Sequence, residues 1–192
     1  MKDKVISFLM AGVGGQGIVL ASNALCAAAL NAGYNVKKSE IHGMAQRGGS
    51  VVSHVRFGEK VWSPAIPLGC ADFILSFERM EYLRYLPFAK DKCTLILNSR
   101  RIFPPGVALG EEVYPDELID NEKTRFTEVC ELDADNIAQE AGNIKTAGLV
   151  MLGKLARYLD ISENLWEEAI KSCVPEKLLS VNIKAFAAGK KL

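Results

Sequence analysis

Short apolar runs and helix-like segments alternate along the chain, and their order predicts an α/β fold. The continuous apolar run from Val5 to Ala11 has the length of a buried strand. A glycine-rich stretch follows, and the next segment, Ile18 to Asn31, has the length and composition of a helix that ends before Gly33. The chain is therefore expected to open with a strand, a tight turn and a helix.

The next fifty residues predict a strand, a loop and a hairpin. Val36 to Ser39 is the expected second strand, and residues 40–49 are expected to form a loop because they contain three glycines and no clean period. Polar and apolar residues alternate from Ser50 to Phe57, and the chain then turns back into Val61-Trp62, which favours a β-hairpin. Ser63 to Pro67 is expected to be irregular, because proline lacks a backbone donor.

The rest of the chain continues the alternation and ends in helices. The expected strands are Asp72 to Phe77, Cys93 to Leu97 and Val129 to Leu132. The expected helices are Arg79 to Leu86, Asn136 to Ala141, Thr146 to Leu159, Glu163 to Ser172, and Glu176 to Ala187 with Gly189 as a C-terminal stop. We predict a Rossmann-like α/β fold, with a mostly parallel sheet, a β-hairpin and a helical C-terminal layer, in one domain over residues 1–192.

Composition limits the classes of partner and cofactor. Lysine plus arginine equals aspartate plus glutamate at 23 each, so no global charge attracts nucleic acid. No apolar run is long enough to cross a membrane. The five cysteines lie far apart without a C-x-x-C pair, which indicates reduced thiols in the cytoplasm and no iron–sulfur cluster or other metal bound by this chain alone.

The first glycine-rich turn is a candidate cofactor-binding site. Gly12, Gly14, Gly15, Gln16 and Gly17 satisfy G-x-G-x-x-G between a predicted strand and a predicted helix. Such a turn presents bare peptide groups and a helix N-terminus to an anion, or it lets the strand, the helix or a neighbouring chain pack closely. Binding of NAD(P) is the weaker interpretation, since only Glu40 is placed to serve as the ribose-binding acid.

Several motifs together carry a resemblance to a known family. In chain order they are Ala11-Gly12-Val13-Gly14-Gly15-Gln16-Gly17, His42-Gly43-Met44-Ala45-Gln46-Arg47-Gly48-Gly49, Ser63-Pro64-Ala65-Ile66-Pro67, Gly69-Cys70-Ala71-Asp72 and Phe77-Glu78. With these motifs the chain resembles the beta subunit of indolepyruvate ferredoxin oxidoreductase, and it is similar to the gamma subunits or domains of pyruvate and 2-oxoglutarate ferredoxin oxidoreductases. One departure is Gly148, where relatives tend to have asparagine, so a side-chain hydrogen bond is not expected there.

The resemblance implies an enzyme subunit that is not active alone. It implies a complex that oxidatively decarboxylates an aryl or other 2-oxoacid, transfers the acyl group to coenzyme A and passes electrons to ferredoxin. Thiamine diphosphate, magnesium and the 4Fe-4S clusters would belong to the large catalytic subunit, and this chain would supply no catalytic residue. An isolated copy is also able to form a homodimer in this interpretation.

The second glycine-rich segment is the candidate substrate or interface site. Arg47 presents a planar guanidinium suited to a carboxylate or phosphate, and Gly48 and Gly49 let backbone approach the same anion. We hypothesise that Arg47, with His42 and Gln46, contacts an anionic group of substrate or coenzyme A, or a carboxylate of the partner subunit. The alternative is that Arg47 pairs with an acid inside this domain and His42 caps a turn.

Two other functions and two structural roles complete the expectations. A stand-alone NAD(P)-dependent reductase would use residues 12–17, and a non-catalytic assembly module would bind a partner that turns over without it. His54, on an alternating strand, is expected to be a half-exposed structural residue rather than a ligand. Glu78 follows the end of an apolar strand, where a carboxylate is expected to cap the next helix rather than act as a base.

Overall fold

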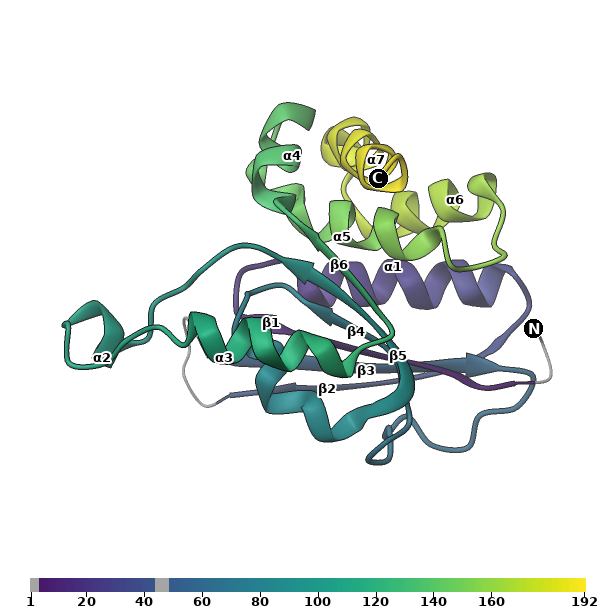
Figure 1. The fold of residues 1–192 in the computed structure, drawn as a ribbon. Coiled ribbons are helices and arrows are strands. Elements are labelled where there is room, and N and C mark those ends of the chain that lie inside the picture. Colours follow the sequence, from purple (N-terminus) through teal and green to yellow (C-terminus); the bar gives the residue numbers. More distant parts are fainter. Residues whose placement is uncertain (1–3, 44–48) are drawn as a thin grey trace.

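The structure, a computed structural model, describes residues 4–43 and 49–192, and its strands form one mixed sheet (Figure 1). The strands are β1 (Ile6–Val13), β2 (Asn35–His42), β3 (Ser50–Gly58), β4 (Ala71–Ser76), β5 (Ala89–Asn98) and β6 (Glu128–Leu132), in the order β2-β3-β1-β4-β5-β6. β1, β4, β5 and β6 pair in parallel, whereas β3 is antiparallel to both β1 and β2. The predicted α/β class with a mostly parallel sheet is confirmed.

Helices cover both faces of the sheet. Five helices lie on one face, namely α1 (Ile18–Asn31), α4 (Ala134–Ala141), α5 (Ala147–Ala156), α6 (Glu163–Cys173) and α7 (Glu176–Lys190) (Figure 1). The 3₁₀ helix η1 (Glu81–Phe88) and α3 (Asp116–Glu122) lie on the other face. The remaining short helices are α2 (Pro105–Ala108), η2 (Lys123–Arg125) and η3 (Ile144–Thr146). α1 has the predicted bounds, and the predicted helical C-terminal layer is confirmed.

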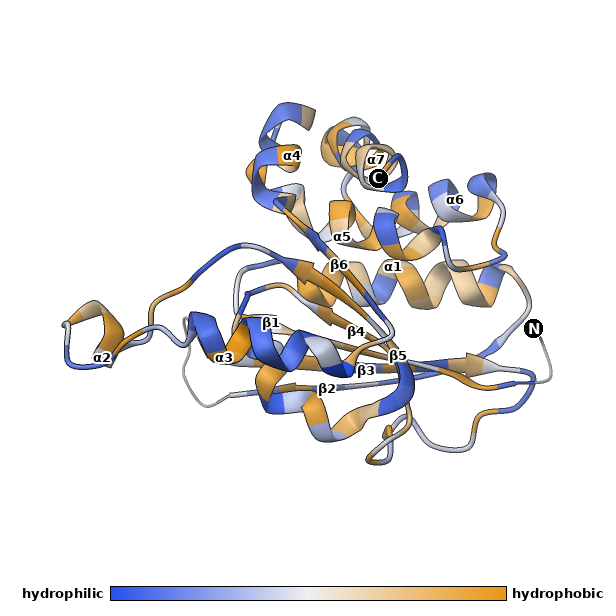
Figure 2. Ribbon diagram, in the orientation of Figure 1, coloured by the Kyte–Doolittle hydropathy of each residue, from blue (hydrophilic) through white to orange (hydrophobic). Residues whose placement is uncertain are grey.

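Alternate residues of β1 enter two separate cores. Phe8 and Met10 pack with the helices of the first face, while Leu9 and Ala11 pack with η1 and α3 on the second. Side chains of a strand point alternately to the two faces, so a strand covered on both faces must be apolar throughout. This arrangement explains the continuous apolar run, and Figure 2 shows the central strands mostly in hydrophobic colours.

Two glycines set the distance between α5 and α7. A Cβ added at Gly153 would lie 2.1 Å from the carbonyl oxygen of Phe186, and one added at Gly189 would lie 2.0 Å from that of Val150. Gly189 was predicted to stop the last helix, but α7 continues through it to Lys190. That prediction was wrong because this glycine serves close helix packing instead of a left-handed terminus.

The predicted hairpin joined the wrong strands. β3 pairs with β2 and β1 along its length, so both of its edges are occupied and Val61-Trp62 forms no strand beside it. β2 also extends to His42, so the first three residues of the predicted loop 40–49 are strand. The true hairpin is formed by β2 and β3. Ser63 to Pro67 is irregular, as predicted.

The short helix predicted for Arg79 to Leu86 is present as a 3₁₀ helix, η1. η1 begins at Glu81 and contains Pro87, which has no N–H to donate to an α-helical bond. Leu83 N donates to the carbonyl oxygen of Met80, three residues earlier, at 3.1 Å. This tighter winding is the one that i to i+3 bonds produce.

His54 is a structural residue, as predicted, but the predicted half-exposure was wrong, because β3 is an interior strand whose second face is covered as well. Its side chain is buried, and its Nδ1 accepts a hydrogen bond of 3.2 Å from the N–H of Ile66. The ring also meets Phe88 edge-on, with centroids 5.6 Å apart. The bond ties the irregular segment after β3 to the sheet. Because Nδ1 is the acceptor, the folded protein holds His54 in its neutral form.

Acid should destabilise the protein through His54. Burial lowers the pKa of His54 from its ordinary 6.5, so its contribution to stability is complete above pH 6.5 and is lost as the pH falls below that value. His54→Asn keeps an acceptor near Nδ1 without titrating. Between pH 7.5 and 5.5, urea unfolding should show the wild type losing stability relative to His54→Asn, by at most about 1.4 kcal/mol per pH unit below 6.5.

The control uses the other histidine. The chain has two histidines, and His42 is exposed at the end of β2. His42→Asn should keep the acid-dependent loss of the wild type. If His54→Asn and the wild type lose stability in parallel as the pH falls, His54 is not held neutral in the folded state.

Candidate anion-binding site

The first glycine-rich segment forms the end of β1 and a turn into α1. Gly12 and Val13 belong to the strand, so the turn itself covers residues 14–17. Gly15 has φ 98° and Gly17 has φ 81°, conformations that glycine adopts without strain. A Cβ at Gly12 would lie 2.6 Å from Oε1 of Gln16 and 2.8 Å from Cβ of Phe77. Gly12 is therefore needed for the close packing of the strand end against the turn.

The side chain of Gln16 fastens the turn to the neighbouring strand. Val13 N donates to Gln16 Oε1 at 2.7 Å, and Gln16 Nε2 donates to the carbonyl oxygen of Phe77 at 2.8 Å. Asn98 Nδ2 donates to the same oxygen at 3.2 Å, and Asn98 Oδ1 accepts from Ala134 N at 3.1 Å. Through the Phe77 carbonyl, the carboxyl ends of β1, β4 and β5 are joined at one point.

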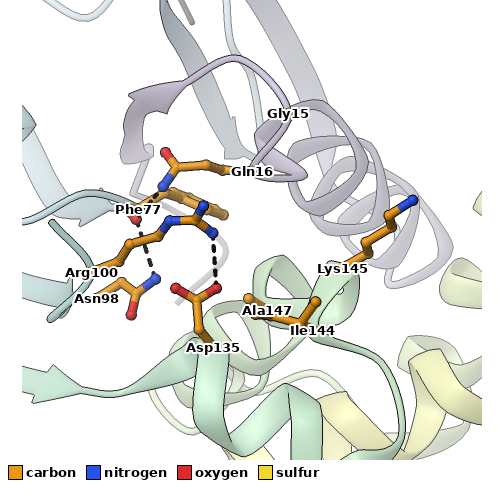
Figure 3. Close-up of a pocket in the computed structure, with 9 residues that line it drawn as sticks. All are labelled: Gly15, Gln16, Phe77, Asn98, Arg100, Asp135, Ile144, Lys145 and Ala147. Carbon is orange, nitrogen blue, oxygen red and sulfur yellow. Dashed lines mark hydrogen bonds and ion pairs between the residues drawn. The ribbon is translucent and has the colours of Figure 1, made fainter. Parts of the chain in front are cut away.

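A pocket of about 220 Å³ opens beside this junction (Figure 3). It lies at the carboxyl ends of β1, β4 and β5, on the edge where the connection from β1 leads through α1 to β2 on one side and that from β4 leads to β5 on the other. In open α/β sheets this switch point is the usual position of a ligand. Its lining includes Gly15, Gln16, Phe77, Asn98, Arg100 and Asp135.

Two helix N-termini converge beside the pocket. Gly17 precedes α1 and Thr146 precedes α5, and neither helix has a side chain that caps its first turn or an acidic residue within that turn. The two helices start close together, because a Cβ at Gly148 would lie only 3.0 Å from the carbonyl oxygen of Gly17. The uncapped N–H groups of α1 and the positive ends of both helices favour an anion here. α5 continues from η3, where Lys145 N donates to Asn143 Oδ1 and Ala147 N donates to the carbonyl oxygen of Ile144.

One arginine adds charge to the pocket. Arg100 Nη1 lies 3.2 Å from Asp135 Oδ1, and the arginine side chain is 42% exposed against 17% for the aspartate. The guanidinium therefore keeps donors accessible after pairing with Asp135. Lys145 also lines the pocket, but Figure 3 shows its ammonium pointing away from the Arg100–Asp135 pair. The arrangement is suited to binding a phosphate or carboxylate group.

The sequence interpretation missed Asn98, Arg100 and Asp135. They lie far along the chain from the glycine turn, and no motif connects them to it. The sequence did carry a signal, because Asn98 and Arg100 follow closely after the predicted strand Cys93 to Leu97. Polar residues at that position gather at the carboxyl edge of the sheet together with the first turn.

The second glycine-rich segment lies beside the first. Gly14 N donates to the carbonyl oxygen of Gly49 at 2.9 Å, so the two segments meet through their backbones. His42 is exposed at the end of β2, with its Nε2 3.4 Å from Glu40 Oε2. Gln46, Arg47 and Gly48 lie outside the described residues.

The position of Glu40 argues against a dinucleotide site. β3 lies between β2 and β1, whereas in the dinucleotide fold the strand that carries the ribose-binding acid is the neighbour of the first strand. Glu40 forms an ion pair with Lys38, and its Oε2 lies 3.4 Å from His42 Nε2. Burial tends to raise the pKa of Glu40, but its hydrogen bonds to Lys38 and His42 outweigh this and lower the pKa. Glu40 is thus a charged, partnered residue one strand away from the turn.

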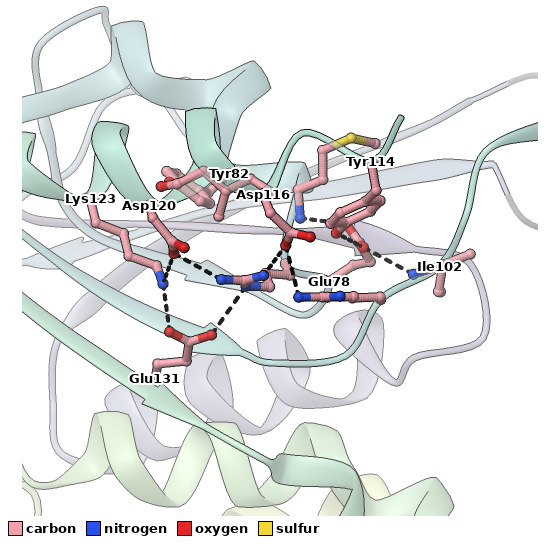
Figure 4. A network of polar contacts seen from close by, with 12 residues as sticks. Glu78, Tyr82, Ile102, Tyr114, Asp116, Asp120, Lys123 and Glu131 are labelled. Carbon is pink, nitrogen blue, oxygen red and sulfur yellow. Dashed lines mark hydrogen bonds and ion pairs between the residues drawn. The ribbon is translucent and has the colours of Figure 1, made fainter. Parts of the chain in front are cut away.

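Glu78, which follows the pocket residue Phe77, is a buried structural carboxylate. It is 1% exposed, and it accepts hydrogen bonds from Met80 N at 2.7 Å, Ile102 N at 3.0 Å and the Tyr114 hydroxyl at 2.7 Å (Figure 4). It also accepts from the N–H of Glu81, the first residue of η1, at 3.1 Å. The predicted capping role of Glu78 is confirmed.

Arg79 holds the segment that carries Arg100. Its backbone N donates to the carbonyl oxygen of Arg100 at 2.9 Å. Its guanidinium forms ion pairs with Asp116, Asp120 and Glu131 (Figure 4). Burial tends to lower the pKa of Arg79, but these three carboxylates outweigh it and raise the pKa. The charged network thereby fixes the backbone on one side of the pocket.

Two buried thiols are unsuited to act as nucleophiles, and the described residues contain no cluster suited to a metal ion. Burial raises the pKa of Cys26 to about 11 and that of Cys93 to about 12, so both are protonated at neutral pH. Among residues 4–43 and 49–192, no group of three or more His, Cys, Asp or Glu side chains is placed to hold a metal ion. No helix within those ranges has both the length and the apolar character needed to cross a membrane.

Removing the Gln16 side chain should weaken the junction. Gln16→Ala removes the acceptor of Val13 N and one of the two donors to the Phe77 carbonyl oxygen. The loss should lower the free energy of unfolding by about 1–3 kcal/mol. Gln16→Glu keeps the acceptor for Val13 but sets a carboxylate against the Phe77 oxygen. It should therefore be unstable at neutral pH and recover in acid, as measured by urea unfolding.

The matched control for this substitution is Gln139→Ala. Gln139 is exposed on α4, so its truncation should leave stability nearly unchanged. Equal stability of Gln16→Ala and Gln139→Ala would show that the two hydrogen bonds of Gln16 do not hold the turn.

Comparison with known proteins places the chain in a family. Residues 7–192 match the family model described as pyruvate ferredoxin/flavodoxin oxidoreductase. The chain is 43% identical over 193 residues to the indolepyruvate oxidoreductase subunit IorB of Thermococcus kodakarensis, with 98% of this chain and 96% of that protein covered.

Two solved structures share the fold at low sequence identity. The pyruvate oxidoreductase subunit PORC of Thermotoga maritima has a TM-score of 0.74 at 22% identity, over 98% of this chain and 97% of that chain. The 2-oxoglutarate:ferredoxin oxidoreductase of Magnetococcus marinus has a TM-score of 0.72 at 22% identity, over 98% of this chain and 31% of that chain. The chain therefore belongs to the pyruvate ferredoxin/flavodoxin oxidoreductase family, among the subunits of indolepyruvate:ferredoxin oxidoreductase.

Proposed function

We propose that this chain completes the active site of a complex that decarboxylates indolepyruvate or another aryl 2-oxoacid. In this proposal the complex forms an acyl-coenzyme A and passes the electrons to ferredoxin. Thiamine diphosphate, magnesium and the 4Fe-4S clusters sit on the large catalytic subunit, which is the direct partner of this chain. Support comes from the 43% identity to an indolepyruvate oxidoreductase subunit over nearly the whole length.

The pocket at the glycine turn is the proposed site for an anionic part of coenzyme A. The single observation that carries this proposal is the convergence of the N-termini of α1 and α5, the first of them uncapped, and Arg100 around one cavity at the carboxyl edge. Phosphate groups bind well to such helix ends, and an arginine adds charge-assisted hydrogen bonds. The matched protein from Magnetococcus marinus is described with coenzyme A and succinyl-CoA bound, which supports the choice of ligand.

The proposed chemistry of this chain is binding and orientation. Gly14 to Gly17 would present backbone N–H groups to the phosphate, and Arg100 would fix the direction from which the coenzyme enters. Gln16 would act as a positioning residue, because it holds the turn through Val13 and Phe77. The bond-making groups would come from the partner subunit, and the pocket wall would exclude water from them.

The second glycine-rich segment is the proposed contact with substrate or partner. Arg47, with His42, Gln46, Gly48 and Gly49, would bind an anionic group of substrate or coenzyme A, or a carboxylate of the large subunit. The hydrogen bond from Gly14 to Gly49 supports this, since it places the start of β3 next to the glycine turn. His42 is exposed at the end of β2, so a ligand or a partner chain can reach it.

The same proposal covers organisation and location. Residues 1–192 would form one domain, because the strands of the described residues share one sheet and the family match extends from residue 7 to residue 192. The complex would work in the cytoplasm, with ferredoxin binding through the large subunit. A homodimer is proposed only for isolated copies of the chain.

Arg100→Gln should raise the KM for coenzyme A in the reconstituted complex. Loss of one charged contact to a phosphate should raise this KM about tenfold, while the KM for indolepyruvate changes little. The assay follows reduction of an artificial electron acceptor. Arg157→Gln, an exposed arginine after α5, is the matched control and should keep the wild-type KM. An unchanged KM for coenzyme A in Arg100→Gln would contradict the proposed site.

Arg47→Ala should impair either catalysis by the reconstituted complex or its assembly. Removal of the guanidinium should raise a KM, lower kcat or weaken assembly with the large subunit, as read by steady-state kinetics and co-purification. Wild-type assembly, kcat and KM values in Arg47→Ala would refute the role of this residue. Full turnover by the large subunit without this chain would refute the larger proposal and favour an assembly module.

A further inference from the structure

A second cavity lies at the opposite edge of the sheet from the glycine turn. It has a volume of about 330 Å³ and sits where β1, β4 and β5 begin. Small-molecule sites in proteins start at about this size. None of the residues discussed for the anion-binding pocket lines it, so the two cavities are separate sites.

Two aromatic rings form rigid apolar walls in this cavity. Phe73 of β4 stacks on Phe8, with centroids 5.2 Å apart and an interplanar angle of 7°. Tyr158, from the turn after α5, meets Phe73 with centroids 5.5 Å apart. The hydroxyl of Tyr158 donates to Glu128 Oε1 at 2.7 Å, which fixes the direction of its ring. The cavity therefore has aromatic lining whose position is fixed before a ligand binds.

Three lysines bring positive charge to the same cavity. Its lining contains Lys4, Lys90 and Lys92 against a single acid, Asp72. Asp72 already accepts a hydrogen bond from Ser7 N at 2.8 Å and forms an ion pair with Lys90. Burial and the nearby charge of Lys4 both lower the pKa of Lys90, so the cations stand close together. Lys4 and Lys92 have no acidic partner among the described residues.

We propose that this cavity binds a small aromatic carboxylate. The ring of the ligand packs against Phe73 and Tyr158, and its carboxylate forms ion pairs with the ammonium groups of Lys92 and Lys4. A neutral aromatic compound leaves the lysines without a counter-charge, and a purely aliphatic acid leaves the two ring faces uncovered. This site goes beyond the proposed function, because it lies on the edge of the sheet away from the glycine turn.

The proposal can be tested with indole-3-acetate as the probe. Titration into the full-length ¹⁵N-labelled chain should shift the amide resonances of Phe73 and Thr94, a residue of the cavity on β5, until they saturate. Indole-3-acetamide, which keeps the ring and loses the charge, should bind at least about tenfold more weakly, and so should acetate, which keeps the charge and loses the ring. The amide resonances of the glycine turn, residues 14–17, should not shift.

A pair of lysine substitutions separates the site from general charge effects. Lys92→Gln should weaken binding of indole-3-acetate about fivefold or more, whereas Lys177→Gln, an exposed lysine on α7, should leave it unchanged. Both positions are on the surface, so neither change threatens folding. Absence of saturation up to about 10 mM would overturn the proposal. Equal binding of the amide or of acetate, or an equal loss in both variants, would overturn it as well.

Discussion

The carbonyl oxygen of Phe77 is the point on which the carboxyl edge of this protein depends. It accepts hydrogen bonds from Gln16 and from Asn98, and these two side chains also bind the backbone of β1 and the start of α4. Parallel strands are joined to one another only through long crossovers, so their ends need such cross-links to keep a common position. The pocket, the turn and the start of α1 all take their places from this junction.

Small residues then bring the helices close enough for their ends to act together. Gly148 sits against the backbone of Gly17, and any side chain there would press on the Gly17 carbonyl. The contact here is therefore between backbones and involves no side chain of residue 148. Gly153 and Gly189 similarly hold α7 tightly on α5. The positive ends of α1 and α5 meet at one pocket as a result.

The charge of the chain sums to zero, yet its distribution is strongly uneven. On the carboxyl edge, Arg79 gathers three carboxylates while Arg100 faces the pocket. On the amino edge, lysines line a cavity with aromatic walls. Salt screens the electrostatic attraction of these charged groups over short distances, so each edge of the sheet is suited to its own anion. Under the two proposals above, the carboxyl edge would bind a coenzyme and the amino edge a second ligand.

By itself the sequence determined what depends on neighbours along the chain. The bounds of α1, the apolar run of β1, the capping by Glu78 and the family motifs are all local patterns of side chains, and local patterns are legible without coordinates. Only the tertiary structure decided that β3 pairs with β2 and β1, and that Asn98, Arg100 and Asp135 lie beside the glycine turn. The physical reason is that strand pairing and pocket formation join residues far apart in sequence. Their positions follow from the packing of whole elements and leave no period in the chain.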